Sequence, residues 1–204
     1  IKLMESGENA RQKPIDCTIP VFVLEYSLEN LLMTEVMERE NRNRSMKVLI
    51  ISDTHRSLNT LLEALEREEP IDMLIHLGDV ERQMADIRQM VDCPIHMIAG
   101  NNDFLSGLSN EEVFKIGRYK VFITHGHGYM VNITEEHLQE AARELGADIV
   151  MYGHTHRPSL LIEEDLITLN PGSLTYPRQS GRHPSYIVME LDKAGEAQFE
   201  VRYL

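Results

Sequence analysis

The chain has 204 residues, of which 33 are acidic and 20 are Lys or Arg, so its formal net charge is −13. A surface this acidic repels a phosphate backbone at long range, which argues against a general binder of duplex DNA. Apolar residues make up 42% and charged residues 26% of the chain, as in an ordinary folded protein rather than a disordered one. The length favours one domain over two.

The two cysteines, Cys17 and Cys93, are far apart in the sequence and form no Cys-x-x-Cys pair. Neither a disulfide framework nor a thiolate zinc site is therefore indicated, and lone thiols suit a reducing cytoplasm. No apolar run approaches the roughly 20 residues of a membrane span, and residues 1–20 lack the basic start and apolar core of a signal peptide. We therefore expect a cytoplasmic protein with no membrane partner.

Residues 1–45 differ in texture from the rest of the chain. Residues 20–26 predict a short strand and residues 27–39 a helix, and a polar linker at 41–45 precedes Met46, where a much stronger pattern begins. We interpret residues 1–45 as an N-terminal extension and residues 46–204 as the main domain, with Met46 as a candidate initiator. The alternative is that the extension adds a strand and a helix to the core of the domain.

Strand and helix patterns alternate from Met46 onward. Buried strands are predicted at residues 47–52, 72–77, 95–99, 119–124 and 148–152, the fourth paired with residues 113–116. Helical spacing of apolar residues predicts helices around 58–65, 84–91 and 138–145, the last begun by Thr134 and ended by Gly146. Short strands follow at 159–162, 166–169, 185–191 and 196–203. This order predicts an α/β fold with a partly parallel sheet, to which the C-terminal strands add antiparallel pairs.

Five of these strands end in polar clusters rich in metal-ligating side chains. In chain order they are Asp53-Thr54-His55, Gly78-Asp79, Gly100-Asn101-Asn102-Asp103, His125-Gly126-His127-Gly128 and Gly153-His154-Thr155-His156. In open α/β sheets, ligands bind just outside the carboxyl ends of the strands, so all five clusters are expected to converge on one crevice. A single Gly-Asp or Asp-x-His is commonly only a turn or a cap. The whole series is what indicates a site.

The spacing within the clusters suits metal binding. Side chains two residues apart on extended chain point to the same side, so Asp53 and His55, or His154 and His156, can each deliver two ligands to one place. The neighbouring glycines permit tight turns and close approach of the backbone. Carboxylates, imidazoles and one amide favour divalent Mn, Fe, Zn, Ni or Co over Ca or Mg.

We therefore predict a site for two divalent metal ions about 3.5–4 Å apart, with one carboxylate and a water or hydroxide bridging them. The first metal is assigned to Asp53, His55 and His156, the second to Asn101, His125 and His154, and the bridge to Asp79.

The series of clusters resembles the calcineurin-like metallophosphoesterase superfamily. The small size and the Asn170-Pro171-Gly172-Ser173 segment followed by Arg178 resemble its YfcE-type phosphodiesterase branch. The resemblance covers Met46 to about Leu204. It implies a four-layer αββα sandwich with a two-metal site, and a reaction in which a metal-activated hydroxide attacks phosphorus in line.

One position departs from the pattern of the superfamily. Many members have Gly-Asn-His, and that His is the usual acid for the leaving group, whereas this chain has Asn102. Proton donation then falls to His127 or to water, and His127 is assigned as either catalyst or support. Asp103 is expected to orient a neighbouring histidine or loop, as outer-shell carboxylates do. Asn102 and Arg178 are candidates for substrate contact, although Arg178 is equally compatible with a surface ion pair.

The leading hypothesis is a phosphodiesterase that uses two metal ions, Mn first among them, on a small or nucleotide-like substrate. The alternative is a scaffold or binding module, because the scaffold subunit of retromer has this fold with a degraded metal site. A nuclease is a third hypothesis, but the net charge of −13 argues against long duplex substrates. A homodimer is expected only as the commonest oligomer.

Overall fold

The computed structural model describes residues 45–204, so the strand and helix predicted within residues 20–39 lie outside the described residues. Two five-stranded sheets form the centre of this part of the chain. The first has the order β10 (Ala197–Tyr203), β9 (Ser185–Leu191), β1 (Met46–Ile51), β2 (Met73–His76) and β3 (Ile95–Met97). The second has the order β4 (Glu111–Ile116), β5 (Tyr119–Thr124), β6 (Ile149–Met151), β8 (Ile167–Pro171) and β7 (Pro158–Ile162).

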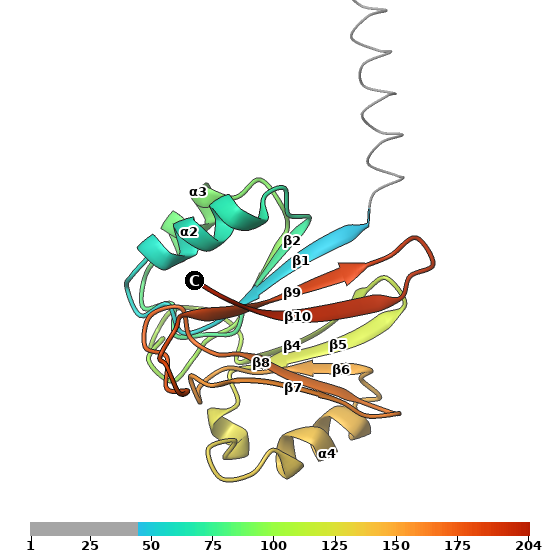
Figure 1. The fold of residues 1–204 in the computed structure, drawn as a ribbon. Helices are drawn as coiled ribbons and strands as arrows, with labels where there is room; N and C mark the ends of the chain where they lie inside the picture. The colour runs from blue at the N-terminus through green and yellow to red at the C-terminus, as the bar shows by residue number, and fades with distance from the viewer. Residues whose placement is uncertain (1–44) are drawn as a thin grey trace, which may run out of the picture. The chain divides into compact units, whose positions relative to one another are not determined.

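Helices cover the outer face of each sheet (Figure 1). Helices α2 (Asn59–Glu68) and α3 (Met84–Met90) pack on the first sheet, and α4 (Glu136–Glu144) packs on the second. A single 3₁₀ turn, η1 (His127–Tyr129), follows β5. The order of layers is therefore helix, sheet, sheet, helix, which confirms the predicted αββα sandwich.

Strand β1 is apolar on both faces because both of its faces are covered. Val48 and Ile50 lie in the core between the two sheets, whereas Leu49 and Ile51 pack beneath α2 and α3. All four side chains are 0% exposed. A central strand with a covered layer on each side needs such a continuous apolar run, and each buried side chain stabilises the fold by about 1.5–3 kcal/mol.

The outer helices are amphipathic, but their buried stripes are narrower than the sequence predicts. In α2, Leu61 and Leu65 are buried, whereas Leu62 is 47% exposed. In α4, Thr134 accepts a hydrogen bond from the Glu136 N–H at the start of the helix. The chain leaves this helix at Gly146, whose φ of +63° is a conformation that glycine adopts without a steric penalty.

Parallel pairing brings the predicted clusters to one edge of the sandwich. Strands β1, β2 and β3 are mutually parallel, with Ile51 opposite His76 and His76 opposite Met97. In the second sheet β5 and β6 are also parallel. The loops that follow these five strands therefore leave the sheets at their carboxyl ends, where the candidate site lies. Within the described residues, no helix has the length and apolar character that a membrane crossing requires.

Candidate metal centre

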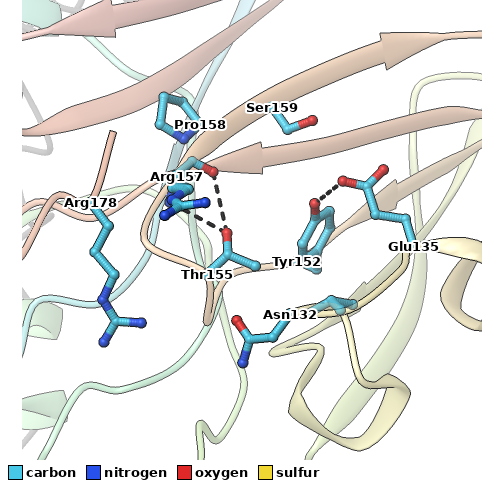
Figure 2. Close-up of a pocket in the computed structure, with 9 residues that line it drawn as sticks. Asn132, Glu135, Tyr152, Thr155, Arg157, Pro158, Ser159 and Arg178 are labelled. Carbon is cyan, nitrogen blue, oxygen red and sulfur yellow. Dashed lines mark hydrogen bonds between the residues drawn. The ribbon is translucent and has the colours of Figure 1, made fainter. Parts of the chain in front are cut away.

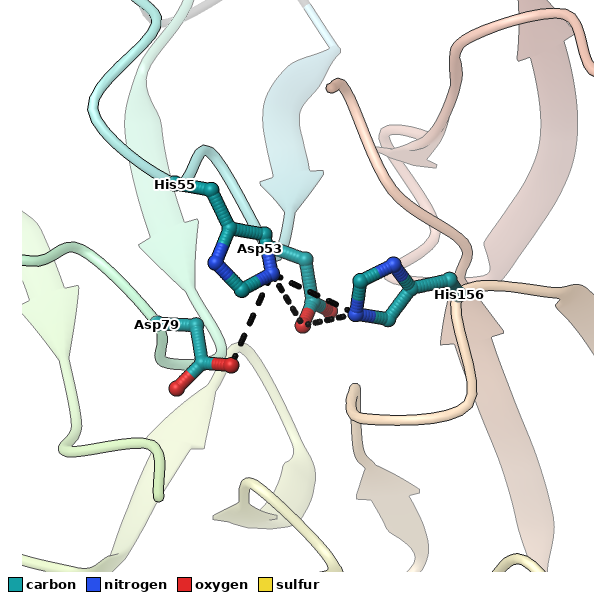
Figure 3. Close-up of side chains that lie close together, drawn as sticks. All are labelled: Asp53, His55, Asp79 and His156. Carbon is teal, nitrogen blue, oxygen red and sulfur yellow. Dashed lines mark hydrogen bonds and ion pairs between the residues drawn. The ribbon is translucent and has the colours of Figure 1, made fainter. Parts of the chain in front are cut away.

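Four side chains from three loops meet in the first half of the site. One potential ligand atom from each of Asp53, His55, Asp79 and His156 lies within 4.8 Å of the others, and Figure 3 shows the four side chains pointing toward one another. Nε2 of His156 lies 3.0 Å from Oδ1 of Asp53, and Nε2 of His55 lies 3.3 Å from Nε2 of His156. These are the three ligands predicted for the first metal together with the predicted bridge.

The second half of the site shares Asp79 with the first. Oδ2 of Asp79 lies 3.6 Å from Nε2 of His55 and also 3.6 Å from Nε2 of His125. Oδ1 of Asn101 lies 3.2 Å from the same nitrogen of His125. The ring of His154 lies beside the His125 ring, with 5.2 Å between their centroids. All seven predicted ligands therefore gather at one place, and a single carboxylate oxygen stands between the two groups.

Hydrogen bonds on the far side of three imidazoles decide which nitrogen faces the centre. Nδ1 of His125 lies 2.6 Å from the carbonyl oxygen of Leu77, and Nδ1 of His156 lies 2.7 Å from that of Tyr176. Because a carbonyl can only accept, both Nδ1 atoms donate, and in the neutral form of each ring Nε2 keeps a free lone pair. Nδ1 of His55 donates in the same way to Glu81, at 2.8 Å. Outer contacts of this kind orient metal-binding histidines in proteins.

The ligand atoms in the first half of the site are arranged to bind a cation rather than to bond to one another. Oδ1 of Asp53 is buried and has no hydrogen bond, although Nε2 of His156 is only 3.0 Å away. A carboxylate oxygen and imidazole nitrogens that point lone pairs at one another repel unless a positive charge lies between them. A divalent metal ion supplies that charge, and the mixture of carboxylate and imidazole ligands suits Mn, Zn, Fe, Co or Ni.

The pKa shifts show the same demand for positive charge. Burial raises the pKa of Asp53, but the imidazoles of His156 and His55 beside its carboxylate and the charge of His125 outweigh it and hold this pKa well below its usual range. Burial lowers the pKa of His55, but the nearby carboxylate of Asp53 and the hydrogen bond to Glu81 outweigh it and raise this pKa to about 9. Without a metal, a proton on His55 therefore provides the cation that the carboxylates require.

Five of the seven ligands have a backbone conformation that is unusual for residues other than glycine. The φ angles are positive, between 41° and 65°, at Asp53, His55, Asp79, His154 and His156. Each costs of order 1 kcal/mol and persists only where surrounding contacts enforce it. Contacts between loops do so here, since the His154 N–H donates to Oδ2 of Asp53 and the His55 N–H donates to the carbonyl of Asp79.

Glycines beside the ligands allow the loops to approach one another. A Cβ on Gly153 would lie 2.0 Å from Oγ of Ser52 and 3.0 Å from Oδ2 of Asp53. A Cβ on Gly100 would lie 2.2 Å from Oδ1 of Asp79. Any side chain at these two positions would therefore displace a ligand, which is the close approach expected from the sequence.

The Asn170-Pro171-Gly172-Ser173 segment has a role that the sequence did not reveal. Asn170 is fully buried at the end of β8, and its amide donates to the carbonyl of Gly153 at 2.7 Å and to Oγ1 of Thr155 at 3.0 Å. Ser173 is also fully buried and donates to the carbonyl of Asp53 at 2.9 Å. These two side chains fix the loops that carry ligands rather than forming a substrate loop. Their signal in the sequence is indistinguishable from that of a turn.

Two further supporting residues were missed in the sequence. Glu81, two positions after Asp79, orients His55 and forms an ion pair with Arg56. The amide of Asn132, in the loop before α4, lies 2.7 Å from Nε2 of His154. Polar residues of this kind are frequent in loops, so only the folded chain distinguishes them.

The four remaining candidates occupy different positions. Asp103 is 7% exposed, and its carboxylate accepts hydrogen bonds from the backbone N–H groups of Gly100, Val80 and Glu81, so it fixes loops instead of facing the centre. Asn102 donates from its side chain to Oδ2 of Asp79 at 2.7 Å and from its backbone to Oδ1 at 2.9 Å. It therefore holds the shared carboxylate.

His127 is exposed, and its side chain makes no hydrogen bond with any residue that the structure describes; its ring lies 5.5 Å from that of His125 and 6.0 Å from that of His154. Partial burial and the charge of His125 lower the pKa of His127. Arg178 is exposed and lines a pocket of about 360 Å³, together with Asn132 and Thr155 (Figure 2).

A two-sheet sandwich with this ligand set defines the metallophosphoesterase class of fold. Comparison with known proteins agrees, and the chain belongs to the calcineurin-like phosphoesterase superfamily, whose domain matches residues 46–194. It is 34% identical over 150 residues to a probable metallophosphoesterase, YsnB of Bacillus subtilis, covering 72% of this chain and 85% of that protein.

Two further relatives differ in what their names describe. The chain is 32% identical over 145 residues to the phosphodiesterase MJ0936 of Methanocaldococcus jannaschii, covering 62% of this chain and 83% of that protein. Its fold matches the crystal structure of Vps29 from Entamoeba histolytica in complex with Zn²⁺, with a TM-score of 0.63 and 28% identity over 78% of this chain and 99% of that one. The family predicted from the sequence is thus confirmed.

Proposed function

We propose that this protein is a phosphodiesterase that uses two divalent metal ions to hydrolyse a small or nucleotide-like phosphodiester. The observation that carries the proposal is the position of Asp79 Oδ2, 3.6 Å from Nε2 of both His55 and His125. One carboxylate oxygen that lies equally far from two ligand groups is the arrangement that a bridged pair of metal ions requires. The phosphodiesterase among the relatives supports a diester as substrate.

Each metal has a defined ligand set in the proposal. Asp53, His55 and His156 would hold the first ion, Asn101, His125 and His154 the second, and Asp79 both. When bound, two such ions supply the Lewis acidity that lowers the pKa of a water toward neutrality and offsets charge on the phosphate oxygens. We propose Mn as the first choice, with Zn, Fe, Ni and Co as alternatives.

The protein side chains orient the reacting groups. Asn102 holds both oxygens of Asp79, which fixes the shared carboxylate in the centre. The ring of His127, which makes no hydrogen bond with the described residues, is available to meet the oxygen of the leaving group. Its lowered pKa leaves the ring neutral near pH 7, and the ring N–H of that form can donate a hydrogen bond as the oxygen departs.

A second function, that of a binding module without catalysis, is favoured by one observation. The position at which many superfamily members carry the acid for the leaving group is Asn102 in this chain, and its amide is already bonded to Asp79. Vps29 structures among those with the same fold keep this alternative open, and the same experiment addresses both functions.

The test is hydrolysis of bis-p-nitrophenyl phosphate by the full chain after metal removal and reloading with Mn. We expect turnover that EDTA abolishes, and a loss of at least a hundredfold in kcat for Asp79→Asn. The matched control is Asp86→Asn, which removes the same charge from an exposed position on α3. Circular dichroism and thermal melting establish that the variants fold.

Bound metal without turnover on any phosphodiester would contradict the enzyme and support the binding module. Full activity of Asp79→Asn would contradict the bridging role.

A further inference from the structure

The pocket of about 360 Å³ beside the metal centre carries two arginines, Arg157 and Arg178. Both are exposed, and neither guanidinium forms an ion pair or a hydrogen bond with the residues that the structure describes. Their backbones are nonetheless fixed. The Arg178 N–H donates to the carbonyl of His156. The Arg157 N–H donates to Oγ1 of Thr155, and that hydroxyl donates to the Arg157 carbonyl. The pocket thus contains two guanidinium groups without an ion-pair partner among the described residues, on a chain of net charge −13.

The pocket keeps a net positive charge, because its lining contains two arginines and one acidic residue, Glu135. Glu135 lines the same pocket, but its carboxylate accepts the hydroxyl hydrogen of Tyr152 (Figure 2). The carboxylate of Glu135 is therefore already partnered on the tyrosine side of the pocket.

The wall of the pocket is made from the loops that carry the metal ligands. Asn132 lines the pocket and lies 2.7 Å from Nε2 of His154, and Thr155 stands between His154 and His156 in the sequence. A group in the pocket is therefore adjacent to a phosphate held at the metal centre.

A second pocket of about 530 Å³ is lined by Asn101, one of the predicted ligands, and shares no lining residue with the first. It contains Asn101 and His127 but no arginine or lysine. Its wall includes the exposed apolar side chains of Phe104 and Leu105. The two spaces next to the centre thus differ in charge, as the two ester groups of an asymmetric diester do.

We propose that Arg157 and Arg178 form a subsite for an anionic group on one ester arm of the substrate, so that the preferred substrates are phosphodiesters carrying a second phosphate or a carboxylate. This inference rests on the proposed function. Guanidinium groups bind both kinds of anion through paired hydrogen bonds, and such charge-assisted contacts are about twice as strong as neutral ones. The uncharged or aromatic arm is left for the pocket of Phe104 and Leu105.

The experiment compares four p-nitrophenyl phosphodiesters that differ only in the second arm: propyl, 2-carboxyethyl, 2-phosphonoethyl and choline. In each, the oxygen of water bonds to phosphorus, the bond to p-nitrophenolate breaks, and the phosphomonoester keeps its arm while a proton is released. We expect kcat/KM about tenfold higher for the anionic arms than for propyl, and lowest for choline. The difference should lie in KM, because the contact is remote from the reacting atoms.

The variants Arg157→Gln and Arg178→Gln, singly and together, test the assignment. We expect the ratio of kcat/KM between the anionic and propyl arms to fall toward one in the double variant, and the ratio in the wild-type protein to shrink as salt rises. Arg88→Gln on α3 removes the same charge from an exposed position that lines neither pocket, and should keep the wild-type ratio.

Equal kcat/KM for all arms, or a ratio that the double variant leaves unchanged, would overturn the subsite while leaving the phosphodiesterase in place. No hydrolysis of any of the four would overturn both. A preference for the phosphonate over the carboxylate identifies the second anion as a phosphate, and the reverse identifies a carboxylic acid.

Discussion

Metal binding by this protein should release a proton, because His55 must give one up to become a ligand. Its pKa in the metal-free chain is about 9: burial lowers it, but the nearby carboxylate of Asp53, the hydrogen bond to Glu81 and the charge of Asp79 outweigh that effect. At pH 7 the ring is therefore protonated, and a metal has to displace that proton.

The size of the effect follows from the difference between pH 7 and the pKa of His55. From pH 7 to a pKa of about 9 is two decades, so the apparent affinity for the first metal should be up to about a hundredfold weaker at pH 7 than above pH 9. The His55 side chain is 10% exposed, and partial screening by solvent reduces the expected factor to between about ten and a hundred. The sign is fixed: affinity rises with pH.

Competition with a chelator of known affinity, at pH values from about 7 to 9.5, measures this dependence for Mn²⁺. Calorimetry in buffers of different ionisation enthalpy counts the protons, and we expect about one per ion at pH 7. Glu81→Gln should weaken metal binding about tenfold and reduce the proton count, whereas Glu63→Gln, at an exposed position on α2, should change neither. An affinity independent of pH, or metal uptake without proton release, would refute the reasoning.

The metal-free protein should be most stable in mildly acidic solution. The lowered pKa of Asp53 contributes stability that is present above about pH 4 and lost as pH falls, and the raised pKa of His55 contributes stability that is present below about pH 6.5 and lost as pH rises through about 9. Melting curves in EDTA across this range check both limbs, and a Tm that keeps rising up to pH 9.5 would be incompatible with the His55 assignment. Gly153→Ala should cost about 1–3 kcal/mol and weaken metal binding, because its Cβ would lie 2.0 Å from Oγ of Ser52. Gly128→Ala is the control, since its Cβ would meet nothing within 4 Å, and equal melting temperatures for the two variants would contradict the packing argument.

The metal ligands could be predicted from the sequence because their signal is local. Each follows an apolar strand closely, so knowing that the strands are parallel is sufficient to place them together. Asp79 is a good example, since only its place after the second strand of the domain marks it. The register in which Ile51 faces His76 then brings the loop of Asp53 beside the loop of Asp79. The extended backbone expected for the two i, i+2 pairs was wrong, because φ is positive at all four of those residues.

The groups that orient those ligands could not be predicted, because their roles depend on approach in three dimensions. The carbonyl oxygens of Leu77 and Tyr176 fix two histidines, and a backbone carbonyl leaves no trace in a sequence. The sequence shows Asn170 only as part of an Asn-Pro-Gly-Ser segment typical of a turn, whereas the structure buries it at the end of β8. Leu62 shows the same limit in the core: its spacing fits the helix stripe, but the sheet covers only Leu61 and Leu65 fully.

An acidic chain can bind an anionic substrate because the charges nearest the substrate differ from the net charge of the surface. The net charge of −13 acts on a long polyanion from outside, where ions in the solvent screen each charge beyond about 8–10 Å. Within the site only Asp53 and Asp79 among the seven ligands are negative, and two divalent ions would more than offset them. Arg157 and Arg178 extend that positive region into the adjoining pocket. A small diester that fits inside this region experiences attraction, whereas a long duplex would meet the acidic surface as well, so substrate length should separate good substrates from poor ones.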